Sequence, residues 1–180
     1  KSIMITGTNG KSTTCKLIQH IFRTNKIDAQ LGGNIGKPLL DLKIKKKTTV
    51  IIEASSFQLN YLKFAKPTFA TILNISRDHI DWHRTFKNYQ NSKFNIFSKQ
   101  DKKDRALLVK KEHIKKFKKK SFRSKLIRIS LSGLTKSFRN QITNKYLLNE
   151  PNLENVLFAY KISSIFNIKK KNYLKRYQYF

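Results

Sequence analysis

The sequence predicts an α/β fold: a P-loop-type, mainly parallel sheet flanked by helices. Short apolar or β-branched runs alternate with longer segments whose apolar residues recur at helical spacing. The first such run is followed by a glycine-rich turn that opens directly into a helical segment. This alternation is typical of a parallel sheet, because parallel strands need a crossover connection between them.

The first half of the chain supplies the elements nearest the glycine-rich turn. Residues 2–6 are a short apolar run, which predicts a buried strand. In residues 12–24 the apolar residues recur at helical spacing and predict a helix. Residues 48–53 are a β-branched run that ends in the carboxylate of Glu53, and residues 68–74 form the third expected strand.

The second half continues the alternation. Large aromatic residues at helical spacing predict a helix at residues 86–98. Two further strands are expected at residues 106–109 and 125–130, with a helix at 112–120 between them, and the last expected helix covers residues 152–168. Sheets of this type bind ligands at the carboxyl ends of their strands, so the segments that follow the first three strands are the candidate site.

Length and composition exclude several classes of protein. The chain has 180 residues, which suits one domain, and its single cysteine excludes an internal disulfide framework. No apolar run approaches the ~20 residues needed to cross a bilayer. We expect a monomeric, cytoplasmic protein that does not insert into a membrane. Because the first residue is Lys1 and lies almost inside a strand pattern, we also expect a piece of a longer protein.

The formal net charge of +29 makes nucleic acid or an anionic membrane the first partners to consider. The positive charge comes from 31 lysines and only 8 arginines. Proteins that recognise nucleic acid favour arginine for bidentate contacts. The excess of lysine over arginine therefore indicates a bias in composition and not a surface selected to bind nucleic acid. We therefore expect no specific nucleic-acid partner. A basic protein that binds nucleic acid through residues 115–120 and the tail 169–180 is the alternative.

The turn at residues 5–13 reads Ile-Thr-Gly-Thr-Asn-Gly-Lys-Ser-Thr. Its two glycines let backbone N–H groups wrap phosphate oxygens, and the helix that follows adds unpaired donors and a partial positive charge. Lys11 can reach the terminal phosphates, and the Ser12 hydroxyl can meet Mg²⁺ or a phosphate oxygen. A turn that merely caps the helix is the alternative. We predict an ATP-type nucleotide site made by Gly7, Thr8, Asn9, Gly10, Lys11, Ser12 and Thr13.

This loop resembles the phosphate loop of the Mur ligase family, which are ATP-dependent amide ligases of peptidoglycan assembly. Further blocks of the sequence resemble the family in the same order: Gly-Gly-Asn-Ile-Gly at 32–36, Glu-Ala-Ser-Ser-Phe-Gln-Leu at 53–59, Asn-Ile-Ser-Arg-Asp-His-Ile-Asp-Trp-His at 74–83, Lys93, and Asn-Leu-Glu-Asn at 152–155. The resemblance implies that residues 1–180 are the family's central ATP-binding domain. It also implies that the N-terminal UDP-binding domain and the C-terminal domain are absent from this chain.

The Ser-Ser-Phe-Gln-Leu block is similar to that of the family members that add D-glutamate to UDP-N-acetylmuramoyl-L-alanine. Such ligases phosphorylate a substrate carboxylate with ATP, and the amine then attacks the acyl phosphate, giving ADP and phosphate. The resemblance therefore implies these two substrates together with ATP and Mg²⁺. A ligase similar to the folylpolyglutamate synthases is the alternative. From this chain alone we expect nucleotide binding with little or no ligation.

The resemblance also implies roles for charged residues. Glu53 would hold Mg²⁺ together with Ser12, and His79 would bind a second Mg²⁺ that a carbamylated Lys93 supports. The candidate catalytic residues are Lys11, His79 and Lys93. Carbamylation needs a neutral amine, so the site should lower the pKa of Lys93.

Polar residues of the other blocks complete the predicted site. Asn34 can donate and accept at once, which suits contact with a polar substrate. Ser55 and Ser56 orient the substrate or, as an equal alternative, cap a helix. Asn152 and Asn155 match residues that face adenine in the family.

Other residues with reactive side chains are expected to be structural. Cys15 suits a small core position, and His83 suits a packing or loop role. The lysines at 115–120 are expected to form a solvated face. Pro151 departs from the family pattern, which commonly has a histidine at that position.

Overall fold

The computed structural model describes residues 1–130, 132, 135–140, 142, 144–150 and 152–168. Six strands form one sheet in the order β2-β3-β1-β4-β5-β6, and all five strand pairings are parallel. The strands are β1 (Ser2–Thr6), β2 (Ala29–Gly33), β3 (Thr49–Glu53), β4 (Phe69–Ile72), β5 (Arg105–Leu108) and β6 (Lys125–Arg128). The expected α/β fold with a parallel sheet is confirmed.

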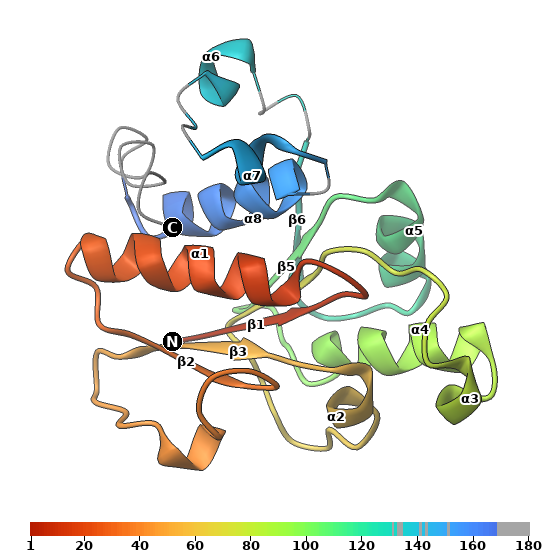
Figure 1. Cartoon of the computed structure of the whole chain (residues 1–180). Helices are drawn as coiled ribbons and strands as arrows, with labels where there is room; N and C mark the ends of the chain where they lie inside the picture. Colours follow the sequence, from red (N-terminus) through yellow and green to blue (C-terminus); the bar gives the residue numbers. More distant parts are fainter. Residues whose placement is uncertain (131, 133–134, 141, 143, 151, 169–180) are drawn as a thin grey trace.

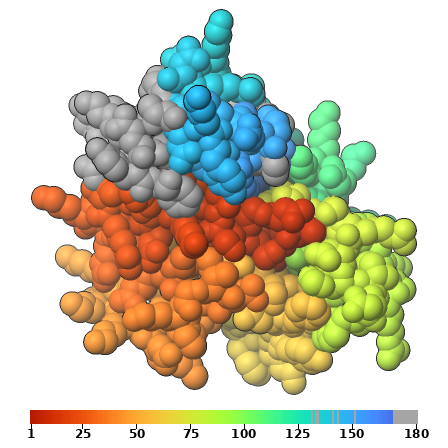
Figure 2. Space-filling model, in the orientation of Figure 1, coloured from red at the N-terminus to blue at the C-terminus, as the bar shows by residue number. Residues whose placement is uncertain are grey.

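Helices cover both faces of this sheet (Figure 1). The longest two, α1 (Lys11–Thr24) and α8 (Asn152–Ile165), lie side by side on one face. Figure 2 shows the red and orange-red residues that include α1 as a band across the molecule, with the blue and cyan residues on one side and the orange residues that follow β2 on the other. The remaining helices are α2 (Ser56–Asn60), α3 (Ile80–His83), α4 (Phe86–Phe94), α5 (Lys111–Lys119), α6 (Lys136–Arg139) and α7 (Lys145–Leu148), with 3-10 turns η1 (Leu39–Asp41) and η2 (Asn95–Phe97).

Burial of one helix face explains why α1 packs against the sheet. Leu17, Ile18, Ile21 and Phe22 are fully buried, as their helical spacing predicts. Each such side chain contributes roughly 1.5–3 kcal/mol when it leaves water. Cys15 is buried in the same cluster, which confirms its core role. A second cluster fills the opposite face, so the sheet separates two apolar layers.

Strand β2 is absent from the elements that the sequence predicts. Its five residues, Ala-Gln-Leu-Gly-Gly, include two glycines, which have little intrinsic strand preference. Pairing with β3 makes this segment an edge strand, so tertiary contact decides its conformation. The short helices α2, α3, α6 and α7 also lie outside the predicted elements, and the helix expected at 86–98 ends at Phe94 and continues as the turn η2.

The lysine-rich helix α5 is mostly exposed, as expected, but Lys116 differs from its neighbours. Its Nζ lies 5.1 Å from the centroid of the Phe94 ring and donates to Gln90. Burial lowers the pKa of Lys116 to about 8, with Lys120 and Lys87 adding repulsion. The tail 169–180 lies outside the described residues. Within the described part of the chain, no helix has the length and apolar character needed to cross a membrane.

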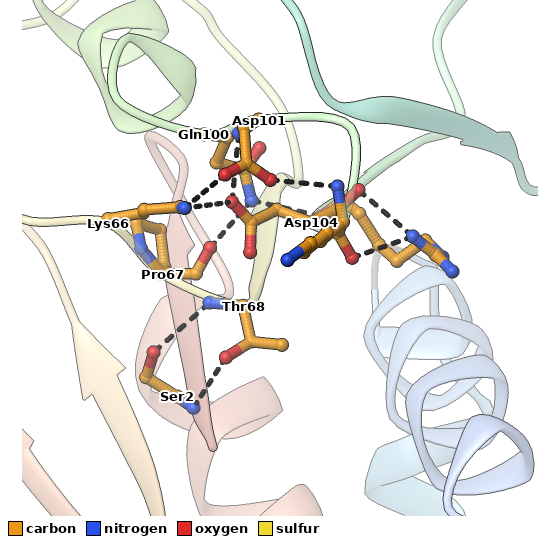
Figure 3. A network of polar contacts seen from close by, with 9 residues as sticks. Ser2, Lys66, Pro67, Thr68, Gln100, Asp101 and Asp104 are labelled. Atoms are coloured by element: carbon orange, nitrogen blue, oxygen red, sulfur yellow. Dashed lines mark hydrogen bonds and ion pairs between the residues drawn. The ribbon is translucent and has the colours of Figure 1, made fainter.

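A polar network closes the sheet at the amino ends of its central strands (Figure 3). The Lys66 ammonium pairs with Asp101 and lies 3.7 Å from a carboxylate oxygen of Asp104. Gln100 is buried and donates to the Pro67 carbonyl at 2.9 Å. These contacts connect the segment before β4 to the segment before β5. The carboxyl-terminal ends of the strands, at the opposite end of the sheet, are therefore left to bind ligands.

Candidate functional site

The phosphate loop links the end of β1 to the start of α1. Gly10 is the N-cap of α1 and has a φ of 81°, a left-handed conformation that suits glycine. Among the residues that the structure describes, no side chain caps this helix, so the first-turn N–H groups have no side-chain acceptor there. The helix start thus offers several donors and a partial positive charge to an anion.

Lys11 folds back over the loop. Its Nζ donates to the carbonyl oxygens of Gly7 at 2.9 Å and Thr8 at 2.8 Å. Burial lowers the pKa of Lys11, while the charges of Glu53 and Asp78 act in the opposite direction. The ammonium therefore lies where phosphate oxygens could replace two backbone carbonyls as its acceptors.

Two neighbouring segments hold the loop in place. The Thr8 hydroxyl lies 2.9 Å from the Tyr89 hydroxyl and accepts from Ser76 N at 3.0 Å. The Asn74 amide bonds both backbone groups of Asn9: its Oδ1 accepts from Asn9 N at 2.9 Å and its Nδ2 donates to Asn9 O at 3.1 Å. The loop conformation therefore depends on β4's end and on α4.

Tyr89 and Asn74 belong to the site although the sequence by itself assigns them no role. The sequence signal for Tyr89 is its place one helical turn before Lys93, and for Asn74 its place just after a buried strand. The signal for Tyr89 is visible only once Lys93 is known to be at the site.

Glu53 is the point where three segments meet. It is 1% exposed at the end of β3, beside Ile5 of β1. Ser12 donates its hydroxyl to one carboxylate oxygen at 2.9 Å, and Asn34 donates its amide to the other at 3.1 Å. The predicted residues Ser12, Asn34 and Glu53 are therefore in direct contact.

The glycine before Asn34 makes this contact possible. Gly33 has a φ of 111°, and a Cβ atom there would lie 2.3 Å from the Glu53 carbonyl oxygen. The Asn34 backbone N–H donates to that same oxygen at 2.9 Å. Only a residue without a side chain brings the chain this close to Glu53.

Lys93 lies under the phosphate loop, 2% exposed. Its Nζ donates to Gly7 O at 2.9 Å and lies 4.7 Å from the centroid of the Tyr89 ring. Burial lowers the pKa of Lys93 to about 7, and the nearby charge of Lys11 adds to this effect. The expected depression of this pKa is confirmed, so a large share of the amine is neutral near pH 7.

His79 caps α3 with a φ of 50°, on the loop that follows β4. Its Nε2 lies 3.4 Å from an Asp78 carboxylate oxygen, and its side chain is 46% exposed. The charge of Asp78 partly offsets the lowering of the pKa of both Lys11 and Lys93, so this loop faces the two lysines. His79 is accessible to solvent and to ligands.

Ser55 and Ser56 have different surroundings. Ser55 caps α2: its hydroxyl accepts from Gln58 N and its own N–H donates to Gln58 Oε1, which makes a complete capping box. Ser56 is buried, with its hydroxyl 3.0 Å from Nε2 of the buried His83. The packing role of His83 is confirmed, and Ser55 is the serine that stays partly exposed.

Asn155 lies directly against the phosphate loop from the start of α8. A Cβ atom on Gly10 would lie 2.3 Å from Asn155 Oδ1, so this buried amide also requires glycine at that position. Asn155 Nδ2 donates to Asn152 Oδ1 at 3.2 Å, and Asn152 donates to Tyr146 O at 2.9 Å. Pro151 lies outside the described residues.

The residues present suit a nucleotide and Mg²⁺. The loop offers backbone donors and one cation, and a buried carboxylate stands beside the Ser12 hydroxyl. No three His, Cys, Asp or Glu side chains gather into a metal cage within the described residues. Mg²⁺ does not need such a cage, because it is commonly held by one or two carboxylates, water and substrate phosphates.

Comparison with known proteins agrees with this geometry. A family model described as the Mur ligase middle domain matches residues 5–171. The chain belongs to the Mur ligase family. Its phosphate loop, Glu53, His79 and Lys93 all fall within the matched range.

Among similar proteins, this Mur ligase domain is 34% identical over 190 residues to the UDP-N-acetylmuramoylalanine--D-glutamate ligase of Natranaerobius thermophilus, covering 94% of the chain and 41% of that protein. It is also 34% identical to the enzyme of the same name from Rickettsia prowazekii, covering 97% of the chain and 43% of that protein. The chain thus spans less than half the length of these relatives.

Solved Mur ligase structures share the fold. MurF ligase from Thermotoga maritima in complex with ADP superposes with a TM-score of 0.71 at 13% identity, covering 97% of this chain and 48% of that one. MurF from Acinetobacter baumannii also has a TM-score of 0.71, at 16% identity, covering 99% of this chain and 46% of that one. At such low identity these structures show the fold alone.

Proposed function

We propose that this chain is the ATP-binding part of a ligase that adds D-glutamate to UDP-N-acetylmuramoyl-L-alanine, with ATP as the phosphoryl donor. The observation that carries the proposal is the meeting of Ser12 and Asn34 on the buried carboxylate of Glu53, beside the phosphate loop. The names of the similar proteins support the choice of substrates.

The reaction begins when a substrate carboxylate oxygen attacks the γ-phosphorus of ATP and ADP leaves. The amine of D-glutamate then attacks the acyl carbon, and phosphate departs. In each step negative charge gathers on oxygens, so the domain contributes mainly by positioning and by fixed positive charge. Lys11 and the first-turn N–H groups of α1 supply that charge on the protein side.

Ser12 and Glu53 are the residues that would hold Mg²⁺, with His79 proposed for a second ion. When bound, Mg²⁺ would neutralise the negative charge that develops on the phosphate oxygens. Glu53 is already pre-oriented by two donors, so its carboxylate needs little rearrangement. Asn34, placed against Glu53, is the proposed contact to the polar substrate, with Ser55 and Ser56 in the adjoining block.

Lys93 is proposed to act as a carbamate. The neutral Nζ attacks carbon dioxide, an N–C bond forms as one C=O π bond shifts its electron pair onto oxygen, and the nitrogen releases a proton, so a neutral amine becomes an anion. Burial and the adjacent Lys11 favour this change, because both disfavour an ammonium at Nζ. The resulting carboxylate would support a second Mg²⁺ together with His79.

The proposal is tested by ADP release from the whole protein. We expect release to require both UDP-N-acetylmuramoyl-L-alanine and D-glutamate, and the product to carry the added mass of one glutamate residue. Lys11→Ala and Glu53→Gln should each lower the rate by at least ~100-fold. Lys16→Ala is the matched control, because Lys16 is an exposed lysine on the same helix.

Two outcomes would contradict this function. Release of ADP that depends on a folate and L-glutamate would assign the chain to the related folate ligases. Activity that survives in Lys11→Ala would remove the phosphate loop from the mechanism.

The carbamate has its own test. Lys93→Ala should lose activity, and short carboxylates such as acetate or formate should restore part of it. Lys11→Ala is the control, since it loses a cation that a carboxylate cannot replace. Absence of rescue, together with absence of extra density on the Lys93 side chain in a crystal structure, would contradict the carbamate.

We further propose that the protein acts as a monomer in the cytoplasm, where ATP is available. Sedimentation of the whole protein at several concentrations checks the first point, and fractionation of cells checks the second. A mass that rises with concentration would contradict the monomer.

A further inference from the structure

A second crevice, whose lining includes no residue of the phosphate loop, lies between α5 and the end of β6. Its volume is about 730 Å³. We call it the basic crevice, and it is lined by Val109, Lys110, Lys111, Ile114, Lys115, Lys118, Arg128 and Ile129, with two serines beside them. The volume falls within the range of small-molecule sites, roughly 300–1,000 Å³.

Positive charge dominates the lining. Lys111, Lys115 and Lys118 follow one another at i, i+4 and i+7, so they share one face of α5. Arg128 faces them from the end of β6. None of these four cations pairs with a carboxylate of the described residues, and no Asp or Glu lines the crevice. Four like charges around one cavity repel one another, and a bound anion would relieve that repulsion.

Apolar side chains form the rest of the lining. Ile129 is buried, and Val109 and Ile114 are half-buried. A flat or apolar group could lie on these three side chains while its charged end meets the cations. The ligand class that matches both features is a phosphorylated small molecule with a planar body.

The crevice lies at the same end of the sheet as the phosphate loop, because all the strand pairings are parallel. The crevice lies beyond the carboxyl ends of the parallel strands β5 and β6, and these strands lie at the far edge of the sheet from β2 and β3 (Figure 1). Lys110 connects it to the first site: its Nζ donates to Glu154 at 2.6 Å, and it also lines a hollow of about 400 Å³ beside Asn9 and Asn74. The two sites are therefore separate but adjacent.

We propose that the basic crevice binds a phosphorylated small molecule of mononucleotide size, independently of the phosphate loop. Lys115, Lys118 and Arg128 hold the phosphate, and Ile114 and Ile129 contact the planar group. The inference does not rest on the ligase activity, and a failure of that activity would leave it standing.

The test is an equilibrium titration of the purified protein with AMP, performed in the Lys11→Ala background so that the phosphate loop contributes little. We expect one AMP per chain. Lys115→Gln with Arg128→Gln should weaken binding at least about tenfold, since charge-assisted contacts are lost. Lys119→Gln with Lys120→Gln is the matched control: it removes the same charge from exposed positions outside the crevice and should change affinity by less than twofold.

Three results would overturn the proposal. The first is no measurable binding of AMP. The second is an equal loss in both double variants, which would indicate attraction to the net charge alone. The third is an affinity that rises steadily with the length of an oligonucleotide and falls steeply with salt, which would indicate a nucleic-acid surface instead.

Discussion

The Nζ atom of Lys93 donates a hydrogen bond to the carbonyl oxygen of Gly7 at 2.9 Å, across 86 positions of the sequence. The same carbonyl also accepts from Lys11 at 2.9 Å. Two lysines therefore converge on the first glycine of the phosphate loop, and the charge of Lys11 adds to the burial that lowers the pKa of Lys93.

Lys93→Met separates the structural from the chemical role of this residue. Methionine fills a similar volume, and the lost donor to Gly7 O is offset in part because a buried amine disappears. We expect the free energy of unfolding to change by less than about 2 kcal/mol, while ligation falls at least ~100-fold. Urea denaturation and ADP release, both performed on the whole protein, measure the two effects. Parallel losses of stability and activity would indicate a packing role only.

Gly10→Ala tests the two reasons why position 10 requires glycine, its left-handed backbone and its close contact with Asn155. The left-handed backbone costs a residue with a Cβ roughly 1–2 kcal/mol, and the new Cβ would also press on Asn155 Oδ1. Gly36→Ala is the control, because Gly36 has a similar φ of 76° and the nearest atom to its added Cβ is the Leu31 carbonyl oxygen at 3.1 Å, against 2.3 Å at Gly10. We expect Gly10→Ala to lower the denaturation midpoint more. Equal midpoints would mean that Asn155 moves aside without cost.

Tyr89→Phe removes one hydroxyl and keeps the ring over Lys93. The variant frees Thr8 from its contact at 2.9 Å, so we expect a loss of about 1 kcal/mol in stability and a severalfold weaker affinity for ATP. Tyr61→Phe, at a residue that is 71% exposed, should change neither quantity. An unchanged ATP affinity in Tyr89→Phe would show that the other loop contacts suffice.

Lys116 makes stability depend on pH in the alkaline range. The folded protein releases this proton above a pKa of about 8, whereas the unfolded chain keeps it up to about 10.5. Between these values the unfolded state binds more protons, so the free energy of unfolding should rise with pH. Because the side chain is only partly buried, we expect a contribution below about 1 kcal/mol.

The measurement compares the wild type with Lys116→Met at pH 8, 9 and 10 by urea denaturation. Taking the difference between the two proteins removes the contributions of the other lysines. The rise should be smaller in Lys116→Met, and Lys115→Met, at an exposed neighbour, should follow the wild type. Parallel curves for Lys116→Met and the wild type would contradict the prediction.

Local patterns sufficed for part of the fold and site. The regular apolar spacing in α1 and the β-branched run of β3 predict their elements, because each pattern reports burial on one face or in a strand. Strand β2 has no such pattern, since two of its five residues are glycines. Its conformation follows from pairing with β3, which no local window contains.

The sequence by itself determined the family and the parallel α/β fold, and it supplied the candidate site residues, because these depend on residue types at fixed spacing along the chain. Only the tertiary structure decided which side chains meet. It brought Asn34 and Ser12 into contact with Glu53. It also placed the Tyr89 hydroxyl against Thr8 and buried Lys93 beneath Gly7. Burial and proximity then set the pKa of Lys93, and neither can be read from a residue's neighbours in sequence.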